Sequence, residues 1–179
     1  MSNPAQTYPP IPDDNLSRSL TVANPDTDQS LMHLAIVGDT YTIVVSGKET
    51  DGKYTLIDML IPPGGGPGPH RHDFEEMFSI LEGEVEMTFR GQTSVAKAGE
   101  TVNIPANAPH VFTNKTGSHV RLLCVCAPSG QEEFFEAVGT PVATRTTPAP
   151  KMSDAEMAAF MKKAAELAPK YRTELLKHA

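Results

Sequence analysis

The hydrophobic pattern between residues 31 and 138 follows the two-residue period of β-strands. Short β-branched runs include LMHLAIV, YTIVVSG and YTLIDMLI, and turn-forming stretches such as GDT and GKETDGK separate them. Further runs follow at intervals of about 8–12 residues, with a turn signal between successive runs. No 3.6-residue period is found before residue 150. The pattern predicts an all-β domain, a small antiparallel sandwich or barrel over residues 31–138.

The segments that flank this domain have different patterns. Residues 1–30 are rich in Pro, Asp, Asn and Ser and lack periodicity, which predicts an extended or mobile N-terminal arm. Residues 139–152 form a linker rich in Pro and Thr. The chain beyond it, residues 153–179, is predicted to be a C-terminal helical segment.

The helix prediction rests on a capping signal and an apolar stripe. Ser153 and Glu156 have the spacing of a capping box. The stripe consists of Met157, Phe160, Met161, Ala164 and Leu167. Pro169 breaks or kinks the helix, and we expect Tyr171, Leu175 and Leu176 to continue its apolar face. The stripe favours packing, on the barrel or on a second subunit.

Composition and charge exclude several classes of function. The chain has 179 residues, of which 39% are hydrophobic, enough for one globular domain with a sizeable core. A formal net charge of −7 disfavours nucleic acid and anionic membranes as partners. No apolar run approaches the roughly 20 residues of a membrane helix, and the first residues lack the pattern of a secretory signal.

The two cysteines, Cys124 and Cys126, lie in the apolar run RLLCVCAP. Two free thiols in such a strand predict a reducing compartment, the cytoplasm. A Cys-x-Cys metal site is one interpretation. We favour buried small hydrophobic residues, because free Cys is among the most buried residue types.

The stretch PGGGPGPHRHDFEEMF, residues 63–78, holds the candidate chemistry. His70 and His72 are two residues apart, so a strand would present both on one face, and Glu76 has the same parity. The Gly and Pro residues before them make a turn that leaves room beside the imidazoles. His110 starts another strand and offers a third imidazole. We interpret the remaining histidines as core or surface residues: His33, His119 and His178.

Three imidazoles and one carboxylate can bind one divalent transition metal, provided that the fold brings His110 beside the others. A five- or six-coordinate ion would keep positions for water or substrate. Three nitrogen donors and one oxygen donor fit Fe, Mn, Ni, Co, Cu or Zn alike.

These residues also match two motifs of a known family. Gly64, His70, His72, Glu76 and Gly83 are in register with the first motif of the cupins. Gly99, Pro105, His110 and Asn114 are in register with the second, while Asn107 replaces a motif glycine. Asn tolerates positive φ better than most residues, so the turn can survive. Over about residues 40–127 the chain resembles a cupin. The resemblance implies a small antiparallel cupin β-barrel (double-stranded β-helix) with His70, His72, Glu76 and His110 on one metal.

Two stretches narrow the resemblance to single-domain, quercetin 2,3-dioxygenase-like cupins. They are residues 41–72 and EEFFEAVGTP, residues 132–141, with the helix that follows. In those enzymes the flavonol hydroxyl meets the metal, the glutamate ligand assists proton removal, and dioxygen cleaves the central ring. The resemblance therefore implies that Glu76 is both ligand and catalytic residue. Family cupins commonly pair, which favours a homodimer here.

Three functions remain open on the sequence. The first is a metal-dependent dioxygenase that acts on a flavonol-like or other aromatic or enolic small molecule. The second is a redox-neutral metal cupin, an isomerase, lyase or hydrolase, and the third is a non-catalytic cupin that binds a small ligand. An apolar pocket predicted from Phe78, Ile80, Val120 and Leu122 favours the first. We interpret Glu82, Glu84 and Glu86, which alternate with Val85, Met87 and Phe89, as a solvated strand face.

Overall fold

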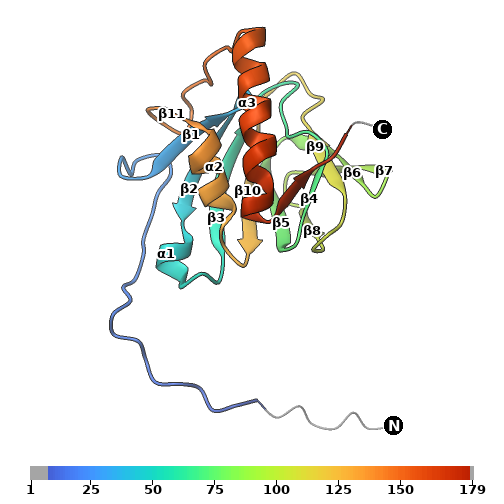
Figure 1. The fold of residues 1–179 in the computed structure, drawn as a ribbon. Helices are drawn as coiled ribbons and strands as arrows, with labels where there is room; N and C mark the ends of the chain where they lie inside the picture. The colour runs from blue at the N-terminus through green and yellow to red at the C-terminus, as the bar shows by residue number, and fades with distance from the viewer. Residues whose placement is uncertain (1–7, 178–179) are drawn as a thin grey trace, which may run out of the picture.

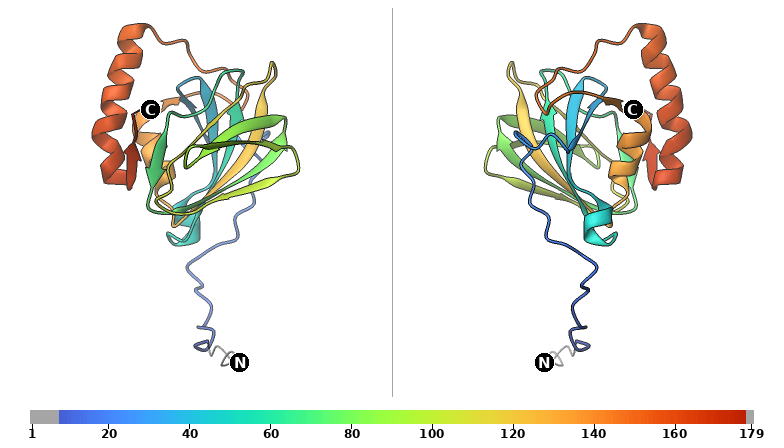
Figure 2. Two further views of the ribbon diagram at one scale, coloured as in Figure 1. Left: turned by 90° about the vertical axis from the view of Figure 1, so that its right-hand side faces the viewer. Right: turned by 90° about the vertical axis from the view of Figure 1, so that its left-hand side faces the viewer.

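The computed structural model describes residues 8–177, which form two facing antiparallel sheets with helices on one side (Figures 1 and 2). The seven-stranded sheet has the order β11-β1-β2-β3-β10-β5-β8, and the five-stranded sheet the order β12-β4-β9-β6-β7. The strands are β1 Met32–Ile36, β2 Asp39–Val45, β3 Thr55–Ile61, β4 His70–His72, β5 Glu75–Glu82, β6 Glu84–Phe89, β7 Gln92–Lys97, β8 Thr101–Ile104, β9 His110–Thr113, β10 Val120–Ala127, β11 Thr140–Pro141 and β12 Thr173–Leu175. The helices are α1 Gly47–Thr50, α2 Gln131–Val138 and α3 Asp154–Leu167, and a 3₁₀ turn, η1, spans Ala168–Tyr171.

The two-residue hydrophobic period becomes the inner and outer faces of the sheets. In β10 every second side chain from Val120 to Cys126 is buried, and the side chains between them are partly exposed. Two sheets that each bury one face must pack those faces together, because apolar area then leaves water. The prediction of an all-β, double-stranded β-helix with a C-terminal helix is confirmed.

The hydrophobic pattern predicted no helix before residue 150, and this prediction is wrong. Helix α2 has eight residues and buries Phe134, Phe135 and Val138. A helix of two turns is too short to repeat its apolar positions, so its pattern cannot be told from that of a buried strand.

Helix α3 begins as its sequence predicts and ends in a different way. The Ser153 hydroxyl accepts a hydrogen bond from the Glu156 amide, completing the capping box. Beyond Leu167 the expected helical continuation is wrong. The chain makes η1 at Pro169, turns through Arg172 at φ 61°, and adds β12 to the five-stranded sheet. Proline cannot continue the helical hydrogen bonds, and the left-handed turn re-aims the chain into an edge strand.

The N-terminal arm lies outside the sheets. From residue 8 to residue 31 the chain forms neither helix nor strand, and it extends away from the sheets (Figure 1). Asp26 ties it to the linker through Arg145, with 2.6 Å between Oδ1 and Nη2. Residues 1–7 of the predicted arm lie outside the described residues. The boundaries proposed for arm, linker and C-terminal segment remain predictions.

Candidate metal centre

Strand β4 presents His70 and His72 to the interior, and Arg71 between them to solvent. We expected Glu76 to follow on the same strand, and this expectation is wrong. The chain crosses from the five-stranded to the seven-stranded sheet at Asp73–Phe74, so Glu76 lies on β5. Its parity is kept, because Phe74 and Glu76 are buried while Asp73 and Glu75 are exposed. Two sheets therefore contribute to one site.

His110 reaches the site through strand pairing. The first residue of β9, His110, is the register partner of His70 on β4. The turn before β9 is fixed by Asn107, which adopts φ 68° and donates its N–H to the His72 carbonyl, 2.6 Å away. The asparagine therefore fills the left-handed position of the motif glycine, as predicted.

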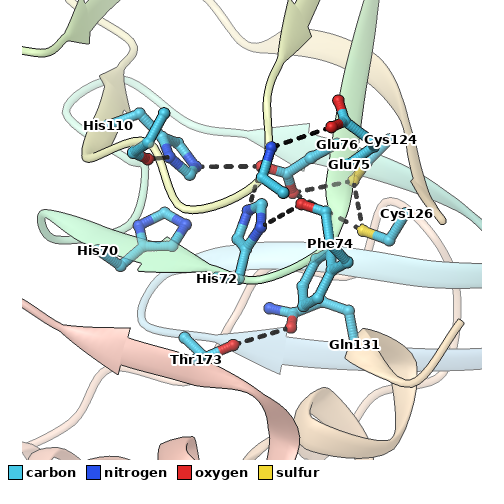
Figure 3. Close-up of polar contacts among 12 residues, drawn as sticks. His70, His72, Phe74, Glu75, Glu76, His110, Cys124, Cys126, Gln131 and Thr173 are labelled. Atoms are coloured by element: carbon cyan, nitrogen blue, oxygen red, sulfur yellow. Dashed lines mark hydrogen bonds and ion pairs between the residues drawn. The ribbon is translucent and has the colours of Figure 1, made fainter. Parts of the chain in front are cut away.

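The four side chains converge inside the protein (Figure 3). Glu76 Oε2 lies 3.1 Å from His72 Nε2 and 3.1 Å from His110 Nε2. The ring centres of His70 and His110 are 4.2 Å apart. One potential ligand atom from each of the four residues lies within 4.8 Å of the others, and all four residues are buried.

Backbone carbonyls fix the orientation of all three imidazoles. Nδ1 lies 2.9 Å from the Gly68 carbonyl in His70, 2.9 Å from the Phe74 carbonyl in His72 and 2.9 Å from the Ala108 carbonyl in His110. A carbonyl only accepts, so each Nδ1 carries the proton and each Nε2 is left to bind. A second hydrogen bond of this kind is typical of metal-ligating histidine.

The arrangement of these atoms suits a shared proton or a cation. When Nδ1 carries the proton, Nε2 of His72 and Nε2 of His110 each direct a lone pair at Oε2 of Glu76. Lone pairs that face an acceptor oxygen repel it unless a shared proton or a metal ion lies between them. Burial would raise the pKa of Glu76, but hydrogen bonds to His110 and His72, made when a proton lies between these atoms, hold it well below its usual range. Burial lowers the pKa of His70 to about 4, and any positive charge on His110 acts in the same direction, so the His70 imidazole is in the ligand form at neutral pH. The residues therefore fit a divalent metal.

Two thiols hold the other oxygen of Glu76, a contact that the sequence analysis missed. Cys124 Sγ lies 3.3 Å from Glu76 Oε1, and the two sulfur atoms are 3.6 Å apart (Figure 3). The register of β10 and β5 pairs Cys126 directly with Glu76, which explains the contact. Burial raises the pKa of Cys124 well above its usual value, so its thiol stays protonated and donates. Both cysteines are buried free thiols, as expected, and they also orient the carboxylate.

The two other histidines that the structure describes, His33 and His119, take no part in the cluster. His33 is buried, and its Nδ1 lies 2.7 Å from the Thr42 hydroxyl. His119 is exposed, and His178 lies outside the described residues. The acidic set is also placed as expected, because Glu82 is exposed and Glu84 and Glu86 are partly exposed, whereas Val85 and Met87 are buried.

A cavity of about 410 Å³ opens beside the cluster. His70 and Glu76 line it, and most of its wall is apolar, with contributions from the barrel, α2, α3 and the chain after η1. Its aromatic side chains are Tyr41, Phe78, Phe112, Phe134, Phe135 and Phe160. The expected apolar pocket is present, although only Phe78 of the four residues named for it lines this cavity. Ile80, Val120 and Leu122 are buried in the core instead.

The C-terminal segment supports the cluster from outside the barrel. Thr173 of β12 pairs with His72 of β4, and Leu175 pairs with His70. The Thr173 hydroxyl donates to Gln131 Oε1 of α2 at 3.3 Å, next to the imidazoles (Figure 3). Sequence spacing cannot reveal such a pairing between strands about 100 residues apart, because a three-residue strand carries almost no pattern.

Comparison with known proteins identifies the family. The family model described as "Cupin domain" matches residues 57–126, which include the whole cluster. An uncharacterized protein of Methanocaldococcus jannaschii is 32% identical over 85 residues, or 47% of this chain and 68% of that protein. The chain is a cupin.

The relatives of this cupin differ in their described activities. Quercetin 2,3-dioxygenase of Bacillus subtilis is 31% identical over 109 residues, or 59% of this cupin and 32% of the enzyme, so the chain spans about a third of that relative's length. A predicted oxalate decarboxylase of Thermotoga maritima shares the fold with a TM-score of 0.54 at 21% identity, covering 60% of this cupin and 99% of that chain. Within residues 8–177, no helix is long and apolar enough to cross a membrane.

Proposed function

We propose that this cupin is a metal-dependent dioxygenase that acts on a flavonol-like or other aromatic or enolic small molecule. One observation carries the proposal: a buried set of three imidazoles and one carboxylate opens onto a cavity with an aromatic wall. The similarity to the quercetin 2,3-dioxygenase of Bacillus subtilis supports the same reaction. The substrates of the proposal are this small molecule and dioxygen.

His70, His72, Glu76 and His110 would hold one divalent transition metal: Fe, Mn, Ni, Co, Cu or Zn. When bound, the metal would lower the pKa of a substrate hydroxyl and bring substrate and dioxygen together. The remaining roles belong to the chain itself. The backbone carbonyls of Gly68, Phe74 and Ala108 orient the imidazoles.

Glu76 is the proposed catalytic residue. Its pKa lies below the usual value, so Glu76 is present as the unprotonated carboxylate that a proton acceptor must be. The thiols of Cys124 and Cys126 hold Oε1, which leaves Oε2 directed to the cluster. The apolar wall excludes water, which strengthens the electrostatic contacts of the site.

A redox-neutral reaction is the alternative that one observation favours. The same cavity contains a second buried carboxyl group, Asp39, so a metal acting only as a Lewis acid could be combined with proton transfer in an isomerase, lyase or hydrolase. A non-catalytic role, binding of a small ligand, would use the same cavity without turnover.

Dioxygen uptake separates these functions. Metal-free protein is loaded with one metal at a time and given a flavonol, while dioxygen and flavonol are both followed. Equal consumption of the two, with at least one metal, supports the dioxygenase. Loss or isomerisation of the flavonol without dioxygen uptake favours a redox-neutral cupin, and binding without any turnover favours a ligand-binding protein.

A variant of Glu76 tests its catalytic role. We expect Glu76→Gln to lower the rate of dioxygen uptake by about 100-fold or more, because the amide cannot accept the proton. Glu75→Gln is the matched control, because Glu75 is adjacent, exposed and turned away from the cluster. Equal activity of the Glu76 variant and the control would refute the role.

We also propose a cytoplasmic location and a homodimer. Two free thiols favour a reducing compartment. The net charge of −7 argues against nucleic acid and anionic membranes as partners.

A further inference from the structure

A buried carboxyl group lies in the cavity wall outside the four-residue cluster. Asp39, the first residue of β2, is only 1% exposed and lines the same cavity as His70 and Glu76. A carboxyl group within a mainly apolar wall is costly unless hydrogen bonds satisfy it. Its contacts therefore show what it can still bind.

Two donors hold the carboxyl group. The Tyr41 hydroxyl donates to Oδ2 at 3.1 Å, and the Gly66 amide donates to Oδ1 at 3.2 Å. A carboxylate offers about four acceptor positions, so about two remain. Asp39 takes part in none of the ion pairs within residues 8–177. The remaining acceptor positions of Asp39 are available to a ligand in the cavity, because Asp39 lines it.

The glycine tract that precedes His70 is shaped around this carboxyl group. A Cβ at Gly65 would collide with Asp39 Oδ1, and a Cβ at Gly66 would collide with the Phe112 carbonyl oxygen. Only glycine lets the backbone approach this closely. The tract thus places Asp39 at a fixed position relative to His70, as expected of a built site.

The strand register separates Asp39 from the proposed metal centre. Tyr41 pairs with Met59, Met59 with Leu122, and Leu122 with Ile80. Ile80 follows Glu76 by four residues on β5, which is about 13 Å along the strand direction. The apolar side chains of Met59 and Phe78 line the cavity as well. Asp39 and the metal centre are therefore two separate polar positions in a mainly apolar wall, which also includes Gln131, Thr173 and Lys177.

We propose that Asp39, positioned by Tyr41 and the Gly66 amide, binds a hydroxyl group at the end of the ligand remote from the metal. This inference rests on the proposed function for the end of the ligand that meets the metal. The ligand class is a phenol of two or more rings with a distal hydroxyl. A site built to accept such a hydrogen bond rejects an analogue that lacks the donor, because the buried carboxyl group is then left unpaired.

A pair of ligands that differ in one hydroxyl tests the inference. The probes are unsubstituted flavonol and the flavonol with one additional hydroxyl at the para position of its outer phenyl ring. Calorimetry on the metal-loaded protein gives both dissociation constants. We expect the para-hydroxylated compound to bind at least about tenfold more tightly to the wild type. We expect Asp39→Ala to reduce this preference to less than about threefold.

The Asp39→Asn variant guards against a failure to fold. It keeps the shape of the side chain, and metal content and the thermal transition report its integrity. The amide accepts a weaker hydrogen bond than a carboxylate, so we expect an intermediate preference. Equal binding of both probes to the wild type overturns this inference alone, as does a preference that both variants retain. If neither probe binds the wild type, the inference and the proposed aromatic ligand both fail.

Discussion

At the scale of single residues, the site depends on which atoms are satisfied by the chain itself. Three backbone carbonyls accept hydrogen bonds from Nδ1 of the three imidazoles, and two thiols donate hydrogen bonds to Oε1 of Glu76. What remains is a set of Nε2 atoms and one carboxylate oxygen that face one another. The chain therefore leaves only these atoms to a cation.

The buried carboxyl group of Asp39 should make the free energy of unfolding depend on pH. Burial raises the pKa of Asp39 from 3.8 to about 7. The folded protein then binds more protons than the unfolded chain between these values. The stability contributed by the neutral carboxyl group is therefore complete below about pH 4 and is lost as the pH rises through about 7.

We expect Asp39→Asn to remove this loss. In metal-free protein, wild type and variant should have similar free energies of unfolding near pH 4, and the variant should be more stable near pH 8 by up to roughly 4 kcal/mol. Urea denaturation at several pH values measures both. If the difference in free energy of unfolding between wild type and Asp39→Asn does not change with pH, the pKa of Asp39 is not raised in the folded protein.

At the scale of elements, the site exists because short strands from two sheets meet at it. The pairing of β4 with β9 brings His70 beside His110, and the crossover after β4 brings in Glu76. Two backbone hydrogen bonds join the glycine tract to the residue after β9. The Gly64 N–H donates to the Asn114 carbonyl, and the Asn114 backbone N–H donates to the Gly65 carbonyl.

Gly66→Ala should disrupt the site through the backbone. Gly66 has φ 121°, and its Cβ would strike the Phe112 carbonyl oxygen on β9. We expect a loss of roughly 2–4 kcal/mol in the free energy of unfolding, together with weaker metal binding. Gly68→Ala is the control, because a Cβ there meets nothing within 4 Å. Equal stability and metal content of the two variants would show that the tract is not constrained in this way.

The sequence predicted those features that depend on local pattern. The parity of His70, His72 and Glu76 was sufficient to place all three side chains inward. The positive φ of Asn107 was expected from the resemblance to the second cupin motif, in which a glycine stands at this position. The break between β4 and β5 was missed because a crossover that preserves parity leaves no mark in the pattern. The thiol contacts and the β12–β4 pair depend on long-range register, which a single sequence does not contain.

At the scale of the whole molecule, the exposed apolar side chains of the N-terminal arm support the proposed homodimer. Ile11, Leu16, Leu20 and Val22 are each more than 80% exposed. Exposed apolar side chains grouped in one segment are typical of an interaction site. The ion pairs of Asp26 with Arg145 and Arg121 fix the base of the arm beside the seven-stranded sheet.

We therefore expect a homodimer in solution. Light scattering coupled to size exclusion should give about twice the chain mass of 19.3 kDa. Replacing Leu16 and Leu20 together by Ser should weaken the dimer, because the apolar area that a partner would cover is reduced. A monomer of the wild-type protein at working concentration contradicts the assembly.

Metal analysis of three variants tests whether the imidazoles of His70, His72 and His110 and the carboxylate of Glu76 hold one divalent metal. Each protein is loaded with the same metal, freed of excess metal and analysed for metal per chain. We expect His72→Ala and His110→Ala to lose at least about nine-tenths of the metal. His119→Ala should keep all of it, because His119 is exposed and distant in the fold. Full metal content in His72→Ala and His110→Ala would show that these histidines are not ligands but ordinary buried strand residues.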